Sequence, residues 1–259
     1  MSNNNISNYS SYISGMNKSY LDKLFFLDKI ENVDTILDFG CAQGDMLRHI
    51  HDISPEIDLY GYDNSSEMIA KANDCHSDIA IFDEDFNVIC KKIDTDTALL
   101  NLSSVIHEVY SYSKPNEIKE FWKRVFDSGF QYISIRDLCL SKTADRETDM
   151  NDYVKAVIKS TPTSLKEFES IWGKVRNNKQ LIHYLMKYRY TDNWQREVRE
   201  NYFPITTEEL LSKISIDKYE IIYFEDYVLP YTYQKVKEDF GIEIKDNTHV
   251  KILLRKKEN

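Results

Sequence analysis

Cysteine, glycine and proline are scarce in this sequence, which has 4, 7 and 5 of them among 259 residues. The cysteines, Cys41, Cys75, Cys90 and Cys139, form no Cys-x-x-Cys pair and have no histidine at zinc-finger spacing. A disulfide framework and a structural zinc site are therefore excluded as expectations, and we expect reduced thiols in the core. With so few glycines, the two at positions 40 and 44 need an explanation.

Long apolar runs and a basic leader are also missing. No stretch approaches the roughly eighteen apolar residues of a membrane span, and the start, MSNNNISNYSSYISG, is rich in Asn and Ser. We therefore predict a cytoplasmic protein with no membrane association. The net charge of −10 argues against nucleic-acid binding by the whole surface, because polyphosphate would be repelled. A local basic patch stays open.

Alternating helix and strand patterns dominate what the sequence does contain. Apolar residues at helical spacing predict a helix over 19–30, and five strand patterns follow, separated by amphipathic helices. The predicted strands are DTILDFG, IDLYGYD, DIAIFD, TALLNLSSVI and FQYISIRDL. This order predicts an α/β fold with a doubly wound, Rossmann-like and mostly parallel sheet, helices on both faces and right-handed crossovers.

The alternation breaks after residue 141 and resumes near residue 205. The interruption is mostly helical, and TTEELLSKI, YEIIYFEDYVL, YTYQKVKEDFGI and HVKILLRKK then restore the pattern. We predict an N-terminal helical cap at 1–30, a sheet domain from 31–141 and 205–259, and a helical insertion or lid at 142–204.

The stretch TILDFGCAQGDMLRHI contains a tight turn between a strand and a helix. Gly40 and Gly44 let the backbone pass close to a ligand, and the helix from Asp45 offers free N–H groups. Asp63 ends the second strand, nineteen residues after Gly44, where a carboxylate can accept hydrogen bonds from a ribose diol. The turn has Ala42 where a nicotinamide dinucleotide fingerprint has its middle glycine, which disfavours that cofactor.

At these residues, LDFGCAQGDML and YGYDNSSEMIAKA, the sequence resembles the class I S-adenosylmethionine-dependent methyltransferases, over most of 33–141 and again over 205–257. The resemblance implies S-adenosylmethionine as cofactor and an antiparallel last strand. It implies that the glycine turn packs against the methionine part, that Asp63 holds the ribose, and that Met68 and Asp83 contact the adenine. The cofactor-binding residues it suggests are Asp38, Gly40, Cys41, Gly44, Asp63, Asn64, Met68, Asp83 and Ser103. In related enzymes the N-terminal segment folds over the cofactor, and we expect Tyr12 or Met16 to do so.

Catalytic side chains are expected after the fourth and fifth strands. NLSSVIHEVYSY resembles the family's segment beside the sulfonium, and it carries His107 and Glu108. Histidine, with an ordinary pKa near ~6.5, suits a general base, although His107 could instead only line the pocket. Arg136 and Asp137 end the fifth strand, where they contact either substrate or each other. We predict catalytic roles for His107, Glu108 and Arg136, and substrate contacts for Tyr110 and Asp137.

The insertion contains a basic, aromatic segment at 171–203, with seven Lys and Arg against three acids. A helical stripe within it is typical of core, but KYRYTDNWQREVRENY alternates charge and rings too closely for one buried stripe. Guanidinium groups suit phosphate or carboxylate, and rings can stack on a base. The predicted substrate contacts here are Arg189, Tyr190, Trp194 and Arg196, supported by Lys187 and Arg199.

Together these features predict a methyltransferase that methylates an oxygen or nitrogen of an anionic small molecule or nucleotide. RNA is the second acceptor class, ranked lower because the rest of the chain is acidic. A protein that binds S-adenosylmethionine without methyl transfer is the alternative from another class.

Overall fold

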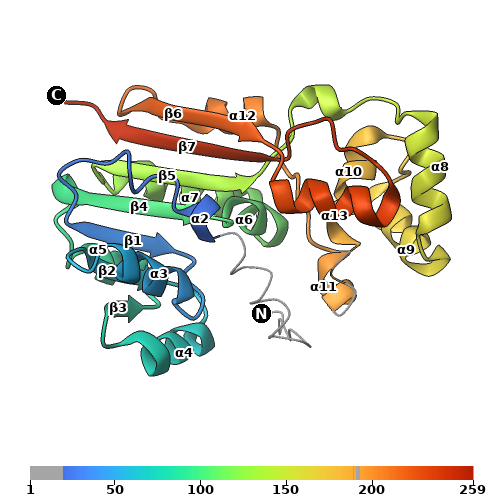
Figure 1. Cartoon of the computed structure of the whole chain (residues 1–259). Helices are drawn as coiled ribbons and strands as arrows, with labels where there is room; N and C mark the ends of the chain where they lie inside the picture. Colours follow the sequence, from blue (N-terminus) through green and yellow to red (C-terminus); the bar gives the residue numbers. More distant parts are fainter. Residues whose placement is uncertain (1–19, 189, 191–192, 259) are drawn as a thin grey trace. The chain divides into compact units, whose positions relative to one another are not determined.

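The computed structural model describes residues 20–188, 190 and 193–258 (Figure 1). The predictions for Tyr12, Met16 and Arg189 lie outside these described residues. The described residues form two compact units. Those of 20–137, 213–225 and 251–258 form one, here called the sheet unit, and those of 138–212 and 226–250 form the other, here called the helical unit.

Seven strands form one sheet in the order β3-β2-β1-β4-β5-β7-β6 (Figure 1). Their bounds are β1 (Thr35–Phe39), β2 (Asp58–Tyr62), β3 (Ala80–Asp83), β4 (Ala98–Ser103), β5 (Tyr132–Leu138), β6 (Tyr219–Tyr227) and β7 (His249–Lys256). Strands β1 to β5 pair in parallel, and all five lie where the sequence patterns predict them. The doubly wound fold class is confirmed.

The last strand, β7, runs antiparallel to both of its neighbours. At one end, Lys256 N–H donates to Gln131 C=O at 2.8 Å, and at the other Cys139 N–H donates to Thr248 C=O at 2.9 Å. Lys257 N–H likewise bonds Lys218 C=O while Thr248 N–H bonds Tyr227 C=O, both at 2.9 Å. In each pairing one residue number rises while the other falls, so the predicted antiparallel last strand is confirmed.

Helices connect the strands, and most begin and end near the predicted residues. They are α2 (Tyr20–Lys23), α3 (Asp45–Ile53), α4 (Ser66–His76), α5 (Phe86–Cys90), α6 (Ile106–Tyr112), α7 (Pro115–Asp127), α8 (Met150–Lys159), α9 (Pro162–Trp172), α10 (Asn178–Lys187), α11 (Trp194–Glu197), α12 (Thr207–Lys213) and α13 (Pro230–Phe240). Ser65 caps α4, its hydroxyl accepting from Met68 N–H at 3.4 Å. No helix in the described part of the chain is long and apolar enough to cross a bilayer.

The helix predicted over 19–30 is wrong in length, because α2 ends at Lys23 and turns follow. Lys23, Leu24, Phe25 and Phe26 are all buried in succession. A regular helix would point some of four consecutive residues toward solvent, so tertiary burial overrides the apolar spacing here.

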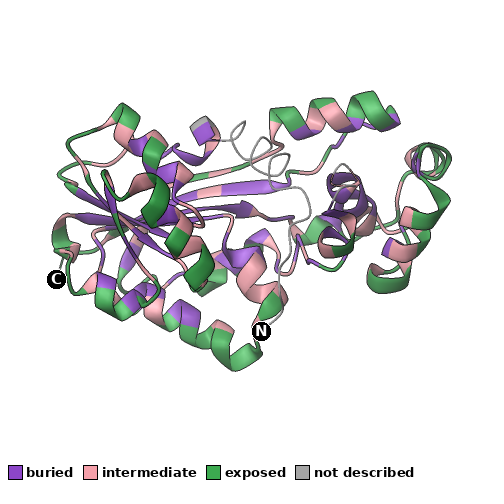
Figure 2. Cartoon of the chain, turned by 90° about the horizontal axis from the view of Figure 1, so that it is seen from below, coloured by how far each residue is buried: buried purple, intermediate pink, exposed green. Residues whose placement is uncertain are grey.

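Helices cover both faces of the sheet, as the buried residues between them show (Figure 2). On one face, Phe26 after α2, Leu47 of α3 and Ala72 of α4 pack in a cluster with strand residues such as Leu99. On the other face a chain of ring contacts links Phe39 to α5 and α7. The carboxyl ends of the parallel strands therefore meet at one edge, where ligands bind in such sheets.

The helical unit has a core of its own. Phe168 of α9, Tyr184 of α10 and Phe240 of α13 are buried together in one apolar cluster. The stripe predicted on 181–188 is confirmed as core, since Leu181, Tyr184 and Leu185 are each at most 2% exposed. This unit thus has an apolar core separate from that of the sheet.

Candidate functional site

The turn after β1 adopts a backbone that only small residues accept. Gly40, Ala42 and Gly44 have φ of 79°, 48° and 88°, all in the left-handed region. A Cβ atom on Gly40 would lie 2.9 Å from Cγ2 of Val105, and one on Gly44 would lie 2.8 Å from Cζ of Phe82. The glycines are thus required by backbone conformation and by close packing, and the turn leaves its backbone bare.

Asp63 lies directly behind this turn. Its carboxylate accepts Ala42 N–H at 3.0 Å and Ser65 N–H at 2.9 Å, one on each oxygen. Burial raises the pKa of Asp63, while the two backbone N–H groups oppose that rise. Because a carboxylate offers about four lone-pair positions, capacity remains for two further donors such as a ribose diol.

A row of polar side chains crosses three strands on the face covered by α2 and α3. Asp38, Asn101 and Ser134 occupy matching positions on β1, β4 and β5, and all three are buried. The amide of Asn101 donates to Oδ1 of Asp38 at 2.8 Å. Burial raises the pKa of Asp38 to about 7, although the Asn101 hydrogen bond and the charge of Lys23 pull it down.

Four buried polar atoms near this row have no hydrogen-bond partner among the residues that the structure describes. They are Oδ1 of Asn101, Oγ of Ser103, Oγ of Ser134 and the hydroxyl of Tyr20. An unsatisfied buried polar atom costs about 1–3 kcal/mol, so four in one place indicate a site that a polar ligand completes. The ammonium and carboxylate of a methionine moiety offer both donors and acceptors, and they fit this set together with Asp38.

Lys23 of α2 belongs to the same site, and the sequence analysis missed it. Its side chain is 6% exposed, and burial lowers its pKa to about 8, helped by Arg136 and opposed by Asp38, Asp137 and Glu108. The only signal in the sequence is that Lys23 is followed directly by Leu24 and two phenylalanines. A longer helix with Lys23 on its exposed face would account for the same sequence.

His107 of α6 and Asp137, near the end of β5, form a buried pair. Nδ1 of His107 lies 2.5 Å from Oδ1 of Asp137. The other oxygen, Oδ2, accepts Ile106 N–H at 2.6 Å and His107 N–H at 3.4 Å, at the first turn of α6. Since an ionised carboxylate only accepts, Nδ1 is the nitrogen that donates in this contact.

Arg136 and Asp137 do not pair with each other, because adjacent residues of a strand point to opposite faces. The guanidinium of Arg136 donates to Oδ2 of Asp22 from Nε at 3.0 Å and from Nη2 at 2.8 Å. Lys251 adds a second cation, its Nζ lying 2.8 Å from Oδ1 of Asp22. The predicted contact between these two residues is therefore absent. Arg136 forms an ion pair with Asp22, and Asp137 contacts His107.

The remaining predicted residues of the sheet unit lie around the same edge. Cys41 is buried, and Met68 and Asp83 are partly buried, whereas Asn64 is exposed. Asp83 accepts Asp85 N–H at 2.9 Å and lies 3.7 Å from Lys92 Nζ. On α6, Glu108 follows His107, and the hydroxyl of Tyr110 accepts the indole N–H of Trp122 at 3.0 Å. None of these contacts tests the predicted cofactor or substrate roles.

The basic segment is more buried than its sequence suggests. Lys187 is 0% exposed, donates to the backbone oxygen of Glu197, and lies 3.5 Å from the centre of the Tyr202 ring. Trp194 is partly buried and donates to Glu167 at 2.8 Å. Tyr190 and Arg196 are also only partly exposed. The sequence predicts that Lys187 supports substrate binding. This prediction is wrong, because the Lys187 side chain is buried inside the helical unit.

Comparison with known proteins is consistent with this geometry. Residues 12–142 match a family model described as a methyltransferase domain. No curated protein sequence matches the chain. A structure of a SAM-dependent methyltransferase from Archaeoglobus fulgidus is 13% identical, with a TM-score of 0.55 and coverage of 96% of this chain and 100% of that one.

Two further solved structures share the fold. The methyltransferase domain of bacterial CtHen1-C has 13% identity and a TM-score of 0.51, covering 93% of this chain and 98% of that chain. A structure titled "Conversion of a Disulfide Bond into a Thioacetal Group during Echinomycin Biosynthesis" has 13% identity and a TM-score of 0.51. The match covers 93% of this chain and 81% of that chain. At these identities the structures show the fold alone.

Proposed function

From the premise that this chain belongs to the methyltransferase domain family and is an S-adenosylmethionine-dependent methyltransferase, we propose that it methylates a hydroxyl oxygen, with His107 as general base. The observation that carries the proposal is the short contact between His107 and Asp137, in which Nδ1 faces the carboxylate and the ring is held in one orientation. A neutral amine needs little help to lose its proton, whereas a hydroxyl does, so a held histidine favours oxygen over nitrogen.

The cofactor supplies an electrophilic methyl group on its sulfonium when it is bound. In the proposed arrangement Asp63 holds the ribose, the bare backbone from Gly40 to Gly44 packs against the methionine part, and Asp38 with Asn101 accepts the ammonium. Each of these groups is already fixed by bonds within the protein, so little ordering remains for binding to impose.

His107 would take the proton of the acceptor hydroxyl at Nε2. Asp137 orients the ring and stabilises the imidazolium that forms, and the N–H groups at the start of α6 hold Asp137 in turn. Most of the remaining acceleration comes from holding acceptor and methyl group in line. Arg136 positions α2 through Asp22, a structural role in place of the catalytic one predicted from its sequence position.

The proposed acceptor is anionic. Within the basic segment this part of the proposal depends on Arg196 and Arg199, because Lys187 is buried; Arg136, on β5, is paired with Asp22. We favour a small molecule over RNA as the acceptor, because the net charge of −10 repels a polyphosphate chain. A steep loss of activity with salt would favour RNA instead.

The test measures transfer of labelled methyl groups from S-adenosylmethionine to extract fractions, with and without nuclease, and then to the isolated acceptor. We expect His107→Gln and Asp137→Asn each to lower kcat by about 10²–10⁴-fold while the affinity for S-adenosylhomocysteine stays within about twofold. His51→Gln, on α3, is the matched control and should retain activity. Unchanged kcat in a folded His107→Gln protein would refute the base.

Binding of S-adenosylhomocysteine without transfer to any fraction would instead support the noncatalytic alternative. The two outcomes are separable, because cofactor affinity is measured by calorimetry without an acceptor.

A further inference from the structure

A cavity of about 480 Å³ lies within the helical unit, apart from the residues assigned to methyl transfer. It is formed by the loop before α8, the start of α8, the end of α9 and the start of α10. The lining residues that matter here are Arg146, Tyr153, Trp172, Lys174, Arg176 and Gln180. The size is within the range of pockets that hold small organic ligands.

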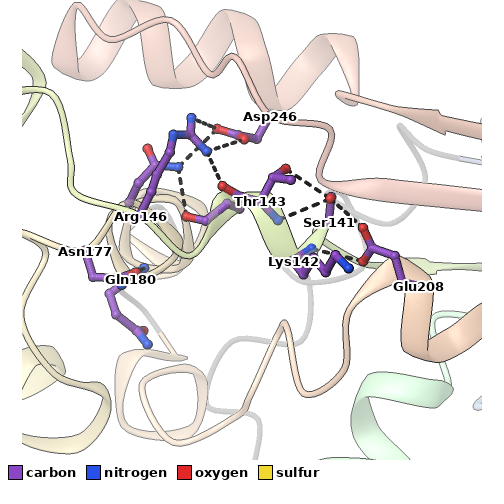
Figure 3. Close-up of polar contacts among 10 residues, drawn as sticks. Ser141, Lys142, Thr143, Arg146, Asn177, Gln180, Glu208 and Asp246 are labelled. Atoms are coloured by element: carbon purple, nitrogen blue, oxygen red, sulfur yellow. Dashed lines mark hydrogen bonds and ion pairs between the residues drawn. The ribbon is translucent and has the colours of Figure 1, made fainter.

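Three cations and one acid, Glu147, line this cavity, and two of the cations are already paired with carboxylates. Arg146 forms two parallel bonds to Asp246, both at 2.8 Å (Figure 3), and Lys174 lies 2.7 Å from Glu169. Arg176 has no carboxylate partner among the residues that the structure describes; its guanidinium lies 4.5 Å from the centre of the Tyr153 ring. A positioned guanidinium without a counter-ion is suited to bind a carboxylate or a phosphate.

Gln180 gives the second requirement. In Figure 3 its side chain is directed away from the Arg146–Asp246 pair, and its Oε1 is buried with no hydrogen-bond partner in the described part of the chain. The nearby hydroxyl of Thr148 is used, since it donates to Val175 C=O at 2.8 Å. A buried amide oxygen left without a donor is costly, so the ligand that completes this cavity carries an N–H or O–H group.

An apolar wall of the cavity gives the third requirement for its ligand. Trp172 is fixed by its indole N–H, which donates to Val198 C=O at 2.6 Å, and Met150, also lining the cavity, is 55% exposed. A fixed ring beside an exposed thioether offers a surface for an apolar side chain.

We propose that this cavity binds an N-acylated amino-acid carboxylate, as a free molecule or as the last residue of a peptide. The carboxylate pairs with Arg176, the amide N–H donates to Oε1 of Gln180, and the side chain packs against Trp172. An anion, a donor and an apolar group at neighbouring positions are the parts of such a residue, and recognition of a terminal carboxylate is a recurring binding mode. The proposal does not depend on the methyl acceptor.

The experiment titrates the whole chain with N-acetylphenylalanine and reads both calorimetry and tryptophan fluorescence. N-acetylphenylalaninamide removes the carboxylate, 3-phenylpropionate removes the N–H, and phenyl phosphate replaces the carboxylate by phosphate. We expect N-acetylphenylalanine to bind with a Kd of about 1 mM or lower and each analogue to bind at least about tenfold more weakly. A short peptide ending in phenylalanine then separates the two sources of the ligand, since tighter binding than N-acetylphenylalanine assigns the site to peptide ends.

Two variants test the assigned contacts. Arg176→Gln should weaken binding of N-acetylphenylalanine by about tenfold or more, and Gln180→Leu should remove its advantage over 3-phenylpropionate. Lys166→Gln, at an exposed lysine of α9 that does not line the cavity, is the matched control and should leave binding unchanged. The proposal is overturned if N-acetylphenylalanine and its amide bind equally well, or if phenyl phosphate binds more tightly than either. It is also overturned if N-acetylphenylalanine shows no binding at about 10 mM, ten times the expected Kd.

Discussion

A buried lysine lies in each unit of this molecule, and the two have different surroundings. Burial lowers the pKa of Lys23 to about 8 and that of Lys187 to about 7. Lys187 donates to the backbone of Glu197 and lies against Tyr202, in a helical core. Lys23 lies near a row of polar side chains, several of whose atoms have no hydrogen-bond partner within the described ranges.

The difference shows which kind of buried charge marks a binding site. A buried cation by itself does not, because Lys187 is accommodated entirely by groups of its own unit. A binding site is marked instead by buried polar atoms whose hydrogen-bonding capacity the described residues leave unused, such as Oδ1 of Asn101 and Oγ of Ser103. The following predictions test that distinction.

The largest effect is expected at Asp63. Asp63→Ala should weaken S-adenosylmethionine binding by roughly 1–3 kcal/mol, because the ribose hydroxyls lose a charged acceptor. Calorimetry with S-adenosylhomocysteine measures it, with thermal unfolding as a check because two backbone N–H groups lose their acceptor as well. Asp58→Ala, at the exposed start of the same strand, should leave the affinity unchanged. Wild-type affinity in a folded Asp63→Ala protein would remove Asp63 from the site.

The two lysines give a matched pair of variants. Lys23→Met should weaken S-adenosylhomocysteine binding about tenfold, because Asp38 loses its cation and is more readily protonated. Lys187→Met should leave that affinity unchanged, and replacing a buried charge by an apolar chain of similar length is often neutral or stabilising. Equal losses of affinity in both variants would contradict the comparison.

Asp38 predicts a smaller, pH-dependent effect. Because burial raises its pKa to about 7, the carboxyl is largely protonated at pH 6 and ionised at pH 8. An ionised Asp38 accepts an ammonium better, so affinity for S-adenosylhomocysteine should rise several-fold across that interval. Asp38→Asn should flatten the profile. A profile that is equally steep in this variant would assign the titration to another group.

The smallest effect concerns stability. Since the folded pKa of Lys187 is below its unfolded value, the unfolded chain binds more protons between about pH 7 and pH 10.5. The contribution of Lys187 to stability therefore rises with pH over this interval. Urea denaturation at pH 7.5 and 9 should show a difference between wild type and Lys187→Met that shifts in favour of wild type at the higher pH. A difference independent of pH would mean that the buried lysine stays protonated.

Local patterns predicted most of the sheet unit from the sequence. The five parallel strands, the glycine turn and Asp63 follow from short-range signals, because strand, turn and helix are set by neighbouring residues. The contact between His107 and Asp137 spans thirty residues, and that between Arg136 and Asp22 spans 114, so no local pattern reveals either. Lys23 was missed because its burial depends on strands that come later in the chain, and Lys187 was misjudged because core packing, not composition, decides which face of α10 is covered.

The place of β7 in the sheet affects how the protein is made. It is the last strand of the sheet to leave the ribosome, yet it lies between β5 and β6 rather than at an edge. During synthesis β5 therefore presents an unpaired border, and β6 has no strand to join until residues 249–256 emerge. Long-range closure of this kind is slow, and an open strand border invites pairing with other chains. Nascent chains halted before β7 should accordingly depend on chaperones more than chains halted after it.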